Sequence, residues 1–344
     1  MAQPRDPRTP KAPSDPERMT DFALVFPGQG SQAVGMGRDL AAASSAAATV
    51  YSTADEALGE AISTLAWEGP DDQLNQTEYA QPALLATSIA YLAAVHERAS
   101  ARGMTLPNPR YYAGHSMGQY SAMVASSALN LPDGLRLVRE RGRRMQASGS
   151  GRDGAMAAII GLDDTQVPAL IHRATERGVF AVANRNSPGQ IVVSGERAAI
   201  EVAAELAKEL GAKRAIILPV SVAAHSPLMA QAAAGMRDVL ATVEFREPTA
   251  ALLANADARP ILDGESARAE LVDHLTTGVD WVAAVEHMSA DGVTTFIEVG
   301  PGKVLTNLIK RIAPDATAIA LDDVLDVDAI DLPVLVPADP SSLA

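Results

Sequence analysis

Residues 111–125 read YYAGHSMGQYSAMVA, an apolar run that passes through a glycine-flanked serine into a second apolar stretch. The run before Gly114 is typical of a buried strand, and the stretch from Met117 has the composition of a helix. Residues 114–118 match the pattern GxSxG, in which a serine lies on a sharp turn between strand and helix. The helix N-terminus there offers backbone N–H groups to a developing negative charge. Ser116 is therefore a candidate nucleophile, although a plain tight turn would also accommodate it.

Strands and helices alternate on both sides of this turn. The apolar run FALVF at 22–26 ends in Pro-Gly, and residues 294–299 run into Gly-Pro-Gly, as buried strands entering loops do. Alanine-rich segments of helical composition cover residues 38–62 and 81–102. This alternation predicts an α/β fold with a mostly parallel sheet.

The middle of the chain follows a different order. Strand-like and helix-like segments alternate as β-α-β-β-α-β at 155–160, 163–177, 179–183, 190–194, 196–210 and 214–218. This order is that of the ferredoxin-like unit. We therefore expect residues 153–219 to form a small subdomain, inserted into a large one made of residues 20–152 and 220–322.

The two ends of the chain differ from the rest. Residues 1–19 carry charge and proline without the apolar segment of a secretion signal, so we expect a disordered tail. Residues 323–344 are expected to form a similar tail, whose Leu and Val side chains could dock on a neighbour. No apolar run approaches the length of about 18 residues that a membrane span needs.

Composition excludes several classes of function. The formal net charge of −14 and the sequence pI of about 4.9 argue against nucleic-acid binding. The chain has no cysteine, which excludes disulfides, thiolate metal sites and a cysteine nucleophile. No metal-binding signature includes any of the six histidines. We expect a cytoplasmic monomer that binds no metal, nucleic acid or membrane.

A serine nucleophile needs a base, because its hydroxyl is weakly nucleophilic at neutral pH. His115 adjoins the serine and should point away from it, while His96, His172 and His287 lie in charged helical patterns typical of a surface. His225 instead lies in the small-residue loop VSVAAHSP, after the last strand of the small subdomain. It is the candidate base, although a hydrogen-bonded structural histidine fits the pattern as well. Either a distant carboxylate or a backbone carbonyl would orient its ring.

Two further segments carry candidate groups. The loop PGQGSQ at 27–32 would bring a backbone N–H close to an oxyanion, unless it is a tight turn only. The segment LRLVRERGRRM at 135–145 contains five arginines, most of which should be solvated. One buried arginine near the serine would select a substrate carboxylate through a bidentate clamp. The others could supply a basic patch for an acidic partner.

Together these motifs resemble the malonyl-CoA:acyl carrier protein transacylases of fatty acid synthesis, to which the acyltransferase domains of polyketide synthases are related. The resemblance extends over about residues 20–322. It includes FPGQGSQ at 26–32, EYAQPALL at 78–85, GHSMGQYSA at 114–122, RGRRMQ at 141–146, NSPGQIVVSG at 186–195, VSVAAHSPLM at 220–229 and EVGPGKVL at 298–305. It implies an α/β-hydrolase-like core with an inserted ferredoxin-like (βαββαβ) subdomain.

The resemblance also implies roles for individual residues. Ser116 would be the acylated nucleophile, and His225 would be its general base and later its general acid. The backbone N–H groups of Gln29 and Met117 would form the oxyanion hole. Arg141 would bind the free carboxylate of the malonyl group. A further residue, Gln81, would line the pocket.

The expected reaction is a transfer of the malonyl group from coenzyme A to the phosphopantetheine thiol of an acidic acyl carrier protein, without a cofactor. A branched malonyl extender for polyketide synthesis stays open as the substrate, because the small side chains at 222–224 do not forbid a branch. Hydrolysis of carrier-bound acyl groups stays open as a second activity.

The chain departs from the family in one place. Many relatives have a glutamine in the segment that corresponds to LVDHLTTGVDW, where this chain has His274. The resemblance implies that the backbone carbonyl at this position orients the catalytic histidine. That role would survive the change, but a second imidazole near the site leaves the pH profile open.

Overall fold

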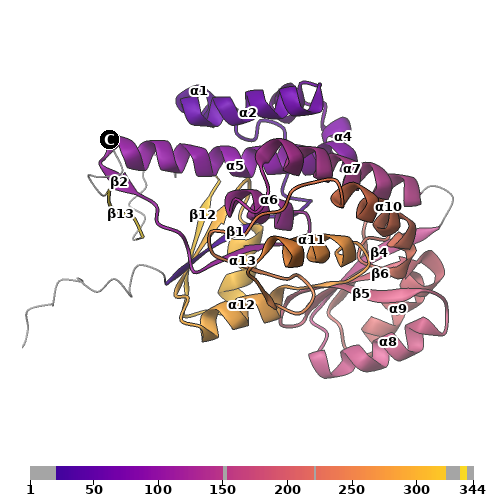
Figure 1. The fold of residues 1–344 in the computed structure, drawn as a ribbon. Coiled ribbons are helices and arrows are strands. Elements are labelled where there is room, and N and C mark those ends of the chain that lie inside the picture. Colours follow the sequence, from indigo (N-terminus) through magenta and orange to yellow (C-terminus); the bar gives the residue numbers. More distant parts are fainter. Residues whose placement is uncertain (1–20, 150–152, 221, 323–333, 339–344) are drawn as a thin grey trace, which may run out of the picture.

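The computed structural model describes residues 21–149, 153–220, 222–322 and 334–338. The chain folds into a large part and a small part, each built on its own sheet (Figure 1). The predicted N-terminal tail, residues 1–19, lies outside the described residues, and so does most of the predicted C-terminal tail.

The larger sheet is mostly parallel, as the sequence predicts. Within the described residues its strands are, in the order in which they pair, β12 (Thr317–Leu321), β11 (Thr295–Val299), β1 (Phe22–Phe26), β3 (Tyr111–Gly114), β8 (Ala251–Leu253) and β9 (Pro260–Ile261). All pairs are parallel except the hairpin of β8 and β9. Both β1 and β3 are buried along their whole length, because strands in the middle of a parallel sheet are covered on both faces.

Helices cover both faces of this sheet (Figure 1). Leu24 and Phe26 of β1 point into one apolar cluster, while Ala23 and Val25 point into another, since successive side chains of a strand alternate. The first cluster includes residues of α1 (Arg38–Ala43), α2 (Ser45–Leu58), α3 (Ile62–Glu68), α4 (Asp71–Leu74), α5 (Thr77–Ala101), α6 (Gly118–Ala125), α7 (Leu131–Gly149), η3 (Pro227–Met229), α10 (Ala230–Leu240) and α11 (Gly264–Asp273). The second includes residues of α12 (Trp281–Ala290) and α13 (Val304–Ile312).

The small part has the predicted ferredoxin-like order. It runs through β4 (Gly154–Ile160), η2 (Asp164–Gln166), α8 (Val167–Thr175), β5 (Phe180–Ser187), β6 (Gln190–Glu196), α9 (Arg197–Glu209) and β7 (Arg214–Ile217). Its strands pair antiparallel in the order β5-β6-β4-β7. Apolar residues of α8 and α9 pack with those of the strands into a separate core, because both helices are amphipathic. The predicted fold class is confirmed.

The strands β8, β9 and β12 of the larger sheet were not predicted, and neither were two further strand pairings. The two-residue strand β10 (Val279–Asp280) joins the smaller sheet by pairing parallel with β5, although it comes from the large part of the chain. Near the C-terminus, β13 (Val336–Pro337) pairs antiparallel with β2 (Met104–Thr105), next to the end of α5. The strands β2, β10 and β13 have two residues each, too few to show a periodic pattern in the sequence.

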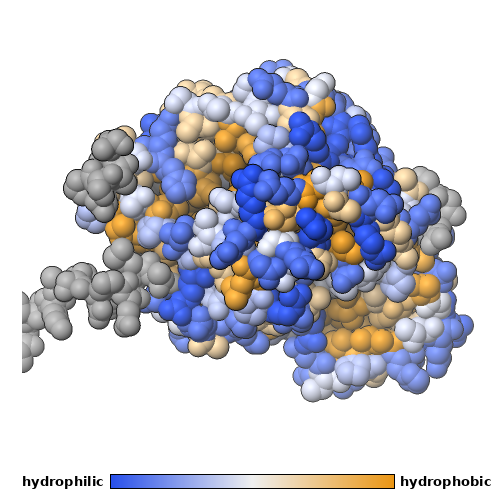
Figure 2. Space-filling model, viewed as in Figure 1, coloured by the Kyte–Doolittle hydropathy of each residue, from blue (hydrophilic) through white to orange (hydrophobic). Residues whose placement is uncertain are grey.

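The surface seen in Figure 2 is mostly hydrophilic over the middle of the molecule, with an apolar area over the region of α8 and α9. In the described part of the chain, no helix combines the length and the apolar character that crossing a bilayer requires.

A buried carboxylate fixes the start of α13. Glu298, on β11, is fully buried and accepts hydrogen bonds from the backbone N–H groups of Leu305 (2.9 Å) and Thr306 (2.7 Å). These donors belong to the first turn of the helix, where backbone N–H groups have no partner within the helix. The carboxylate therefore joins the sheet to the helix that covers its second face.

Replacing Glu298 with Ala should lower the free energy of unfolding by about 1–3 kcal/mol, because two buried donors lose their acceptor. Glu298→Gln retains one acceptor oxygen and should lie between Ala and the native chain. Urea unfolding followed by circular dichroism measures both. Glu286→Ala, at an exposed position of α12, is the matched control and should change stability by less than about 0.5 kcal/mol. An equal effect of all three substitutions would contradict the role assigned to this carboxylate.

Candidate active site

The serine turn has the strained geometry that GxSxG predicts. Ser116 has a φ of 52°, a left-handed conformation that is uncommon outside glycine. A Cβ atom on Gly114 would lie 2.0 Å from the backbone carbon of Gly118, and one on Gly118 would lie 2.2 Å from the carbonyl oxygen of Phe26. Both positions therefore require glycine. The turn projects Ser116 from the end of β3 at the start of α6.

Ser116 and His225 lie within hydrogen-bonding distance, 109 positions apart in the sequence. Ser116 Oγ is 2.8 Å from His225 Nε2. His225 Nδ1 lies 2.8 Å from the carbonyl oxygen of Thr277 and 3.1 Å from that of His274. Since carbonyls only accept, Nδ1 carries the proton and Nε2 presents its lone pair to the hydroxyl. Of the two ways of orienting the ring that the sequence leaves open, backbone carbonyls are the one observed.

The His225 ring is neutral in the folded protein. Burial and the nearby positive charge of Arg141 lower its pKa from 6.5 to about 3. A neutral imidazole whose Nε2 faces a hydroxyl has the protonation state of a general base. The adjacent His274 is also buried and has a pKa well below 6.5, for the same two reasons.

Arg141 lies on α7 with its guanidinium directed at the serine. The side chain is 1% exposed, and its Nη2 donates to Ser116 Oγ over 3.3 Å. Its Nη1 donates to Oε1 of the buried Gln81 over 2.7 Å, while its Nε has no partner. Gln81 in turn directs its Nε2 at Sδ of Met145, 3.5 Å away. Among the described residues, no carboxylate forms an ion pair with Arg141.

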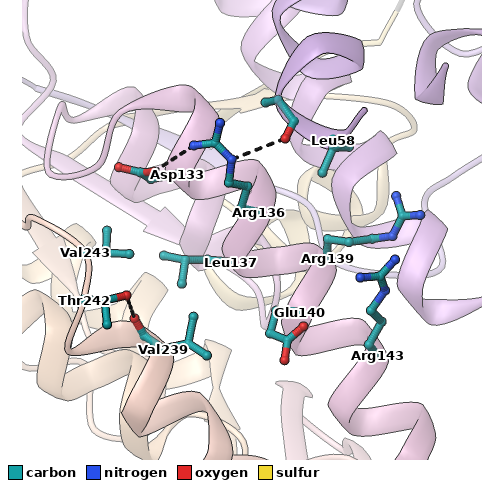
Figure 3. A pocket seen from close by; sticks show the side chains of 11 residues that line it. Leu58, Asp133, Arg136, Leu137, Arg139, Glu140, Arg143, Val239, Thr242 and Val243 are labelled. Carbon is teal, nitrogen blue, oxygen red and sulfur yellow. Dashed lines mark hydrogen bonds and ion pairs between the residues drawn. The ribbon is translucent and has the colours of Figure 1, made fainter. Parts of the chain in front are cut away.

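The other arginines of this segment are neutralised. Ion pairs join Arg136 to Asp133, Arg139 to Glu60, Arg143 to Glu78 and Arg144 to Glu140. Three of these arginines line a cavity of about 460 Å³ between α2, α7 and α10, away from the serine (Figure 3). Neighbouring carboxylates offset the charges of these arginines, and their role as a basic patch for an acidic partner stays a prediction.

Gln29 and Met117 lie on either side of the elbow. Met117 directly follows Ser116 and precedes α6, and Gln29 follows β1, which pairs with β3 through Phe26 and Gly114. A Cβ atom on Gly28 would lie 2.6 Å from the carbonyl oxygen of His115, so the loop passes very close to the turn. In the described residues, neither the Gln29 nor the Met117 amide donates to a protein acceptor. Both donors therefore remain available to a ligand.

Asn255 is a site residue that was not predicted from the sequence. Its side chain accepts from the Ser116 amide (2.9 Å) and donates to the Gly114 carbonyl (2.8 Å), while its own amide donates to Glu270 Oε1 (2.8 Å). The position of Asn255, just after the apolar run ALLA at 251–254, was the available signal, since polar residues at the carboxyl ends of parallel strands often line sites. The predicted surface position of His287 is also wrong, because it is half-buried against Tyr111.

Within the described residues, no group of three or more His, Asp or Glu side chains is arranged to hold a metal ion. The groups that converge on Ser116 are an imidazole, a guanidinium and a carboxamide. They can remove a proton from the serine and hold an anion beside it.

Comparison with known proteins agrees with this geometry. Residues 23–325 match the acyl transferase domain family. The chain is 44% identical over 305 residues to the malonyl CoA-acyl carrier protein transacylase of Escherichia coli K12, covering 89% of this chain and 97% of that one. The crystal structure of an acyl carrier protein S-malonyltransferase from Vibrio cholerae superposes with a TM-score of 0.85 at 42% identity, covering 90% of this chain and 100% of that one. A malonyl-transacylase in complex with its type II polyketide synthase acyl carrier protein gives a TM-score of 0.83 at 38% identity, covering 89% and 97%.

The low pKa of His225 has a measurable consequence for the reactivity of Ser116. Its rate of reaction with a sulfonyl fluoride should stay nearly level from pH 8 down to pH 5, because the base remains unprotonated. A histidine with the ordinary pKa of 6.5 would lose about 30-fold over this range. A half-maximal rate near pH 6.5 would contradict the neutral buried ring.

Circular dichroism at each pH separates this effect from unfolding. His225 and His274 have folded-state pKa values below 6.5, so an unfolded chain binds more protons. Stability is therefore lost as the pH falls below 6.5.

Proposed function

Since the chain belongs to the acyl transferase domain family, we propose that it carries a malonyl group from coenzyme A to the phosphopantetheine thiol of an acyl carrier protein, through an ester on Ser116. The names of its relatives support the donor and the acceptor. The observation that carries the proposal is the buried guanidinium of Arg141, which has no carboxylate partner in the described part of the chain and lies 3.3 Å from Ser116 Oγ.

The environment of Arg141 is what a dicarboxylic acyl group requires. A buried charge without a counter-ion costs several kcal/mol, so such a site favours an anionic ligand strongly. An acyl group held on Ser116 with a free carboxylate at its far end supplies that anion. Gln81 occupies one edge of the guanidinium, which leaves the Nη2 and Nε side for the ligand. Gln81 then orients the Arg141 guanidinium that binds the carboxylate.

The reaction proceeds by double displacement. His225 Nε2 takes the proton of Ser116 Oγ as this oxygen attacks the thioester carbonyl, and the amides of Gln29 and Met117 donate to the oxyanion. The C–S bond then breaks and the imidazolium protonates the departing thiolate of coenzyme A. In the second half, Nε2 takes the proton of the carrier thiol, the thiolate attacks the malonyl ester, and Ser116 recovers its proton. No cofactor is needed to balance either half.

The carbonyls of Thr277 and His274 stabilise the charged intermediate form of the base. When Nε2 is protonated, Nδ1–H still donates to these two acceptors, whose dipoles favour the imidazolium. Two backbone carbonyls therefore take the place that a carboxylate has in a Ser-His-Asp triad.

Three further features belong to the proposal. The acceptor is an acidic carrier protein, the enzyme works as a monomer, and it acts in the cytoplasm. Arg136 and Arg143, exposed on the outer face of α7, are candidates for contacts with this partner. No feature of the site favours hydrolysis or a branched extender over malonyl transfer.

Incubation with radiolabelled malonyl-CoA should place about one malonyl group per chain on Ser116, as located by peptide mass spectrometry. Adding phosphopantetheinylated carrier protein should then move the label to its thiol faster than free malonate appears. The Ser116→Ala variant is the control and should take up no label. Absence of a labelled ester would refute the proposal, and release of free malonate in place of transfer would identify a hydrolase.

Arg141→Ala should lower kcat/KM for malonyl-CoA by roughly 30-fold to several thousand-fold, because a buried charge-assisted contact is lost. The value for acetyl-CoA should change far less, since that acyl group has no carboxylate. The ratio of the two, measured by competition in one reaction, reports the clamp directly. Arg143→Ala, on the exposed side of the same helix, is the matched control. An unchanged ratio in Arg141→Ala would exclude the clamp.

A further inference from the structure

Asn255 lies where β8 separates from β3. The two strands pair as Tyr111 with Ala251 and Tyr112 with Leu252, and continuing this register places Asn255 opposite His115. In a parallel pairing, the residue opposite position 115 would bond to the carbonyl of residue 114 and the amide of residue 116. The Asn255 carboxamide makes these same two bonds, to Gly114 (2.8 Å) and Ser116 (2.9 Å). The Asn255 side chain thus continues the hydrogen-bond pattern between β3 and β8 as far as Ser116.

The main chain of Asn255 is engaged elsewhere. Its amide donates to Glu270 Oε1 over 2.8 Å, and its carbonyl accepts from the Asp280 amide over 2.7 Å. All the polar groups of this buried residue are therefore used, and the carboxamide is held between the elbow and α11. Rotation of the side chain would break both bonds to the turn.

The orientation of the Asn255 carboxamide determines which ring nitrogen of His274 carries the proton. Backbone groups fix Oδ1 as the acceptor from Ser116 and Nδ2 as the donor to Gly114. His274 Nε2, 3.2 Å from the same Oδ1, must then be the donor. Its Nδ1 is buried, unprotonated and without a partner. The imidazole consequently acts as a neutral N–H donor that holds Asn255 in place.

The main chain of His274 also contacts His225. Its carbonyl accepts from His225 Nδ1 over 3.1 Å, and the two rings are 5.5 Å apart. His274 thus contacts Asn255 through its ring and His225 through its main chain. We propose that Asn255 and the His274 side chain are positioning residues that together hold Ser116 in register with His225. The proposal rests on the function proposed above, because it concerns the same acylation step.

Asn255→Ala should lower kcat for malonyl transfer by roughly 100-fold, since displacing a nucleophile by a fraction of its contact distance has effects of this size. The KM for malonyl-CoA should change little, because Arg141 and Gln81 are untouched. Each kcat is referred to the concentration of Ser116 that malonyl-CoA can acylate, so that unfolded chains are not counted.

The His274 variants separate positioning from packing. His274→Leu should lower kcat about 10-fold, because one hydrogen bond to Asn255 is lost. His274→Gln should stay close to the native rate, since a glutamine amide can donate to the same oxygen while the carbonyl to His225 remains. This pair tests the proposal even if Asn255→Ala does not fold. In Asn255→Ala, the added His274→Leu substitution should cost no further activity, because its acceptor is already absent.

Asp263→Ala is the matched control for stability. Asp263 caps α11, the helix that leads to His274, by accepting from the amide of Ser266 over 2.8 Å. Its loss should lower the melting temperature by a few degrees and leave kcat unchanged. Additive effects of the Asn255 and His274 substitutions, or equal losses in His274→Leu and His274→Gln, would overturn the proposal. Failure of the native chain to form a malonyl ester would instead refute the proposed function.

Discussion

The geometry of the site depends on holding Ser116 in a left-handed conformation, and His225, with a φ of 58°, shares this uncommon backbone state. The strain at Ser116 lies in one residue, whereas the contacts that hold it in place come from several elements of the large sheet. Gly114 and Gly118 allow β3, α6 and the end of β1 to meet at distances that a Cβ atom would prevent. The hydroxyl then projects from the carboxyl edge of the sheet, where the loops that follow other strands converge. Residues 109 positions apart thereby come within 2.8 Å.

Charge is distributed unevenly around this point. The imidazoles of His225 and His274 are buried and neutral, and their N–H groups donate to carbonyl and carboxamide oxygens. Arg141 carries positive charge at this site and, among the described residues, forms no ion pair, whereas Arg136, Arg143 and Arg144 of the same helix pair with Asp133, Glu78 and Glu140. An acidic protein with a formal net charge of −14 can therefore contain a pocket that attracts anions.

Much of the fold could be predicted from the sequence, because its central elements have strong local patterns. The apolar runs of β1 and β3, the turn at Ser116 and the β-α-β-β-α-β order each follow from periodicity and turn residues. Ser116 and His225 were candidates from local pattern, whereas the roles of Gln29, Met117, Arg141 and Gln81 came from the family resemblance. The position of Asn255 after an apolar run was a signal, but its contacts could not be predicted, since they depend on the register of β8 against β3 and on Glu270, fifteen residues later. Two of the ion pairs of α7 were missed for the same reason, because their partners Glu60 and Glu78 come from distant segments.

The short strand β10 connects the smaller sheet to the base. Val279 and Asp280 pair with Asn184 and Arg185 of β5, and only Gly278 separates them from the carbonyl of Thr277 that accepts from His225. Any tilt of the smaller sheet relative to the larger one would therefore pull on that carbonyl through two peptide units. The serine is anchored in the larger sheet and would not follow. The orientation of the His225 ring relative to Ser116 therefore depends on how the smaller sheet is placed against the larger one.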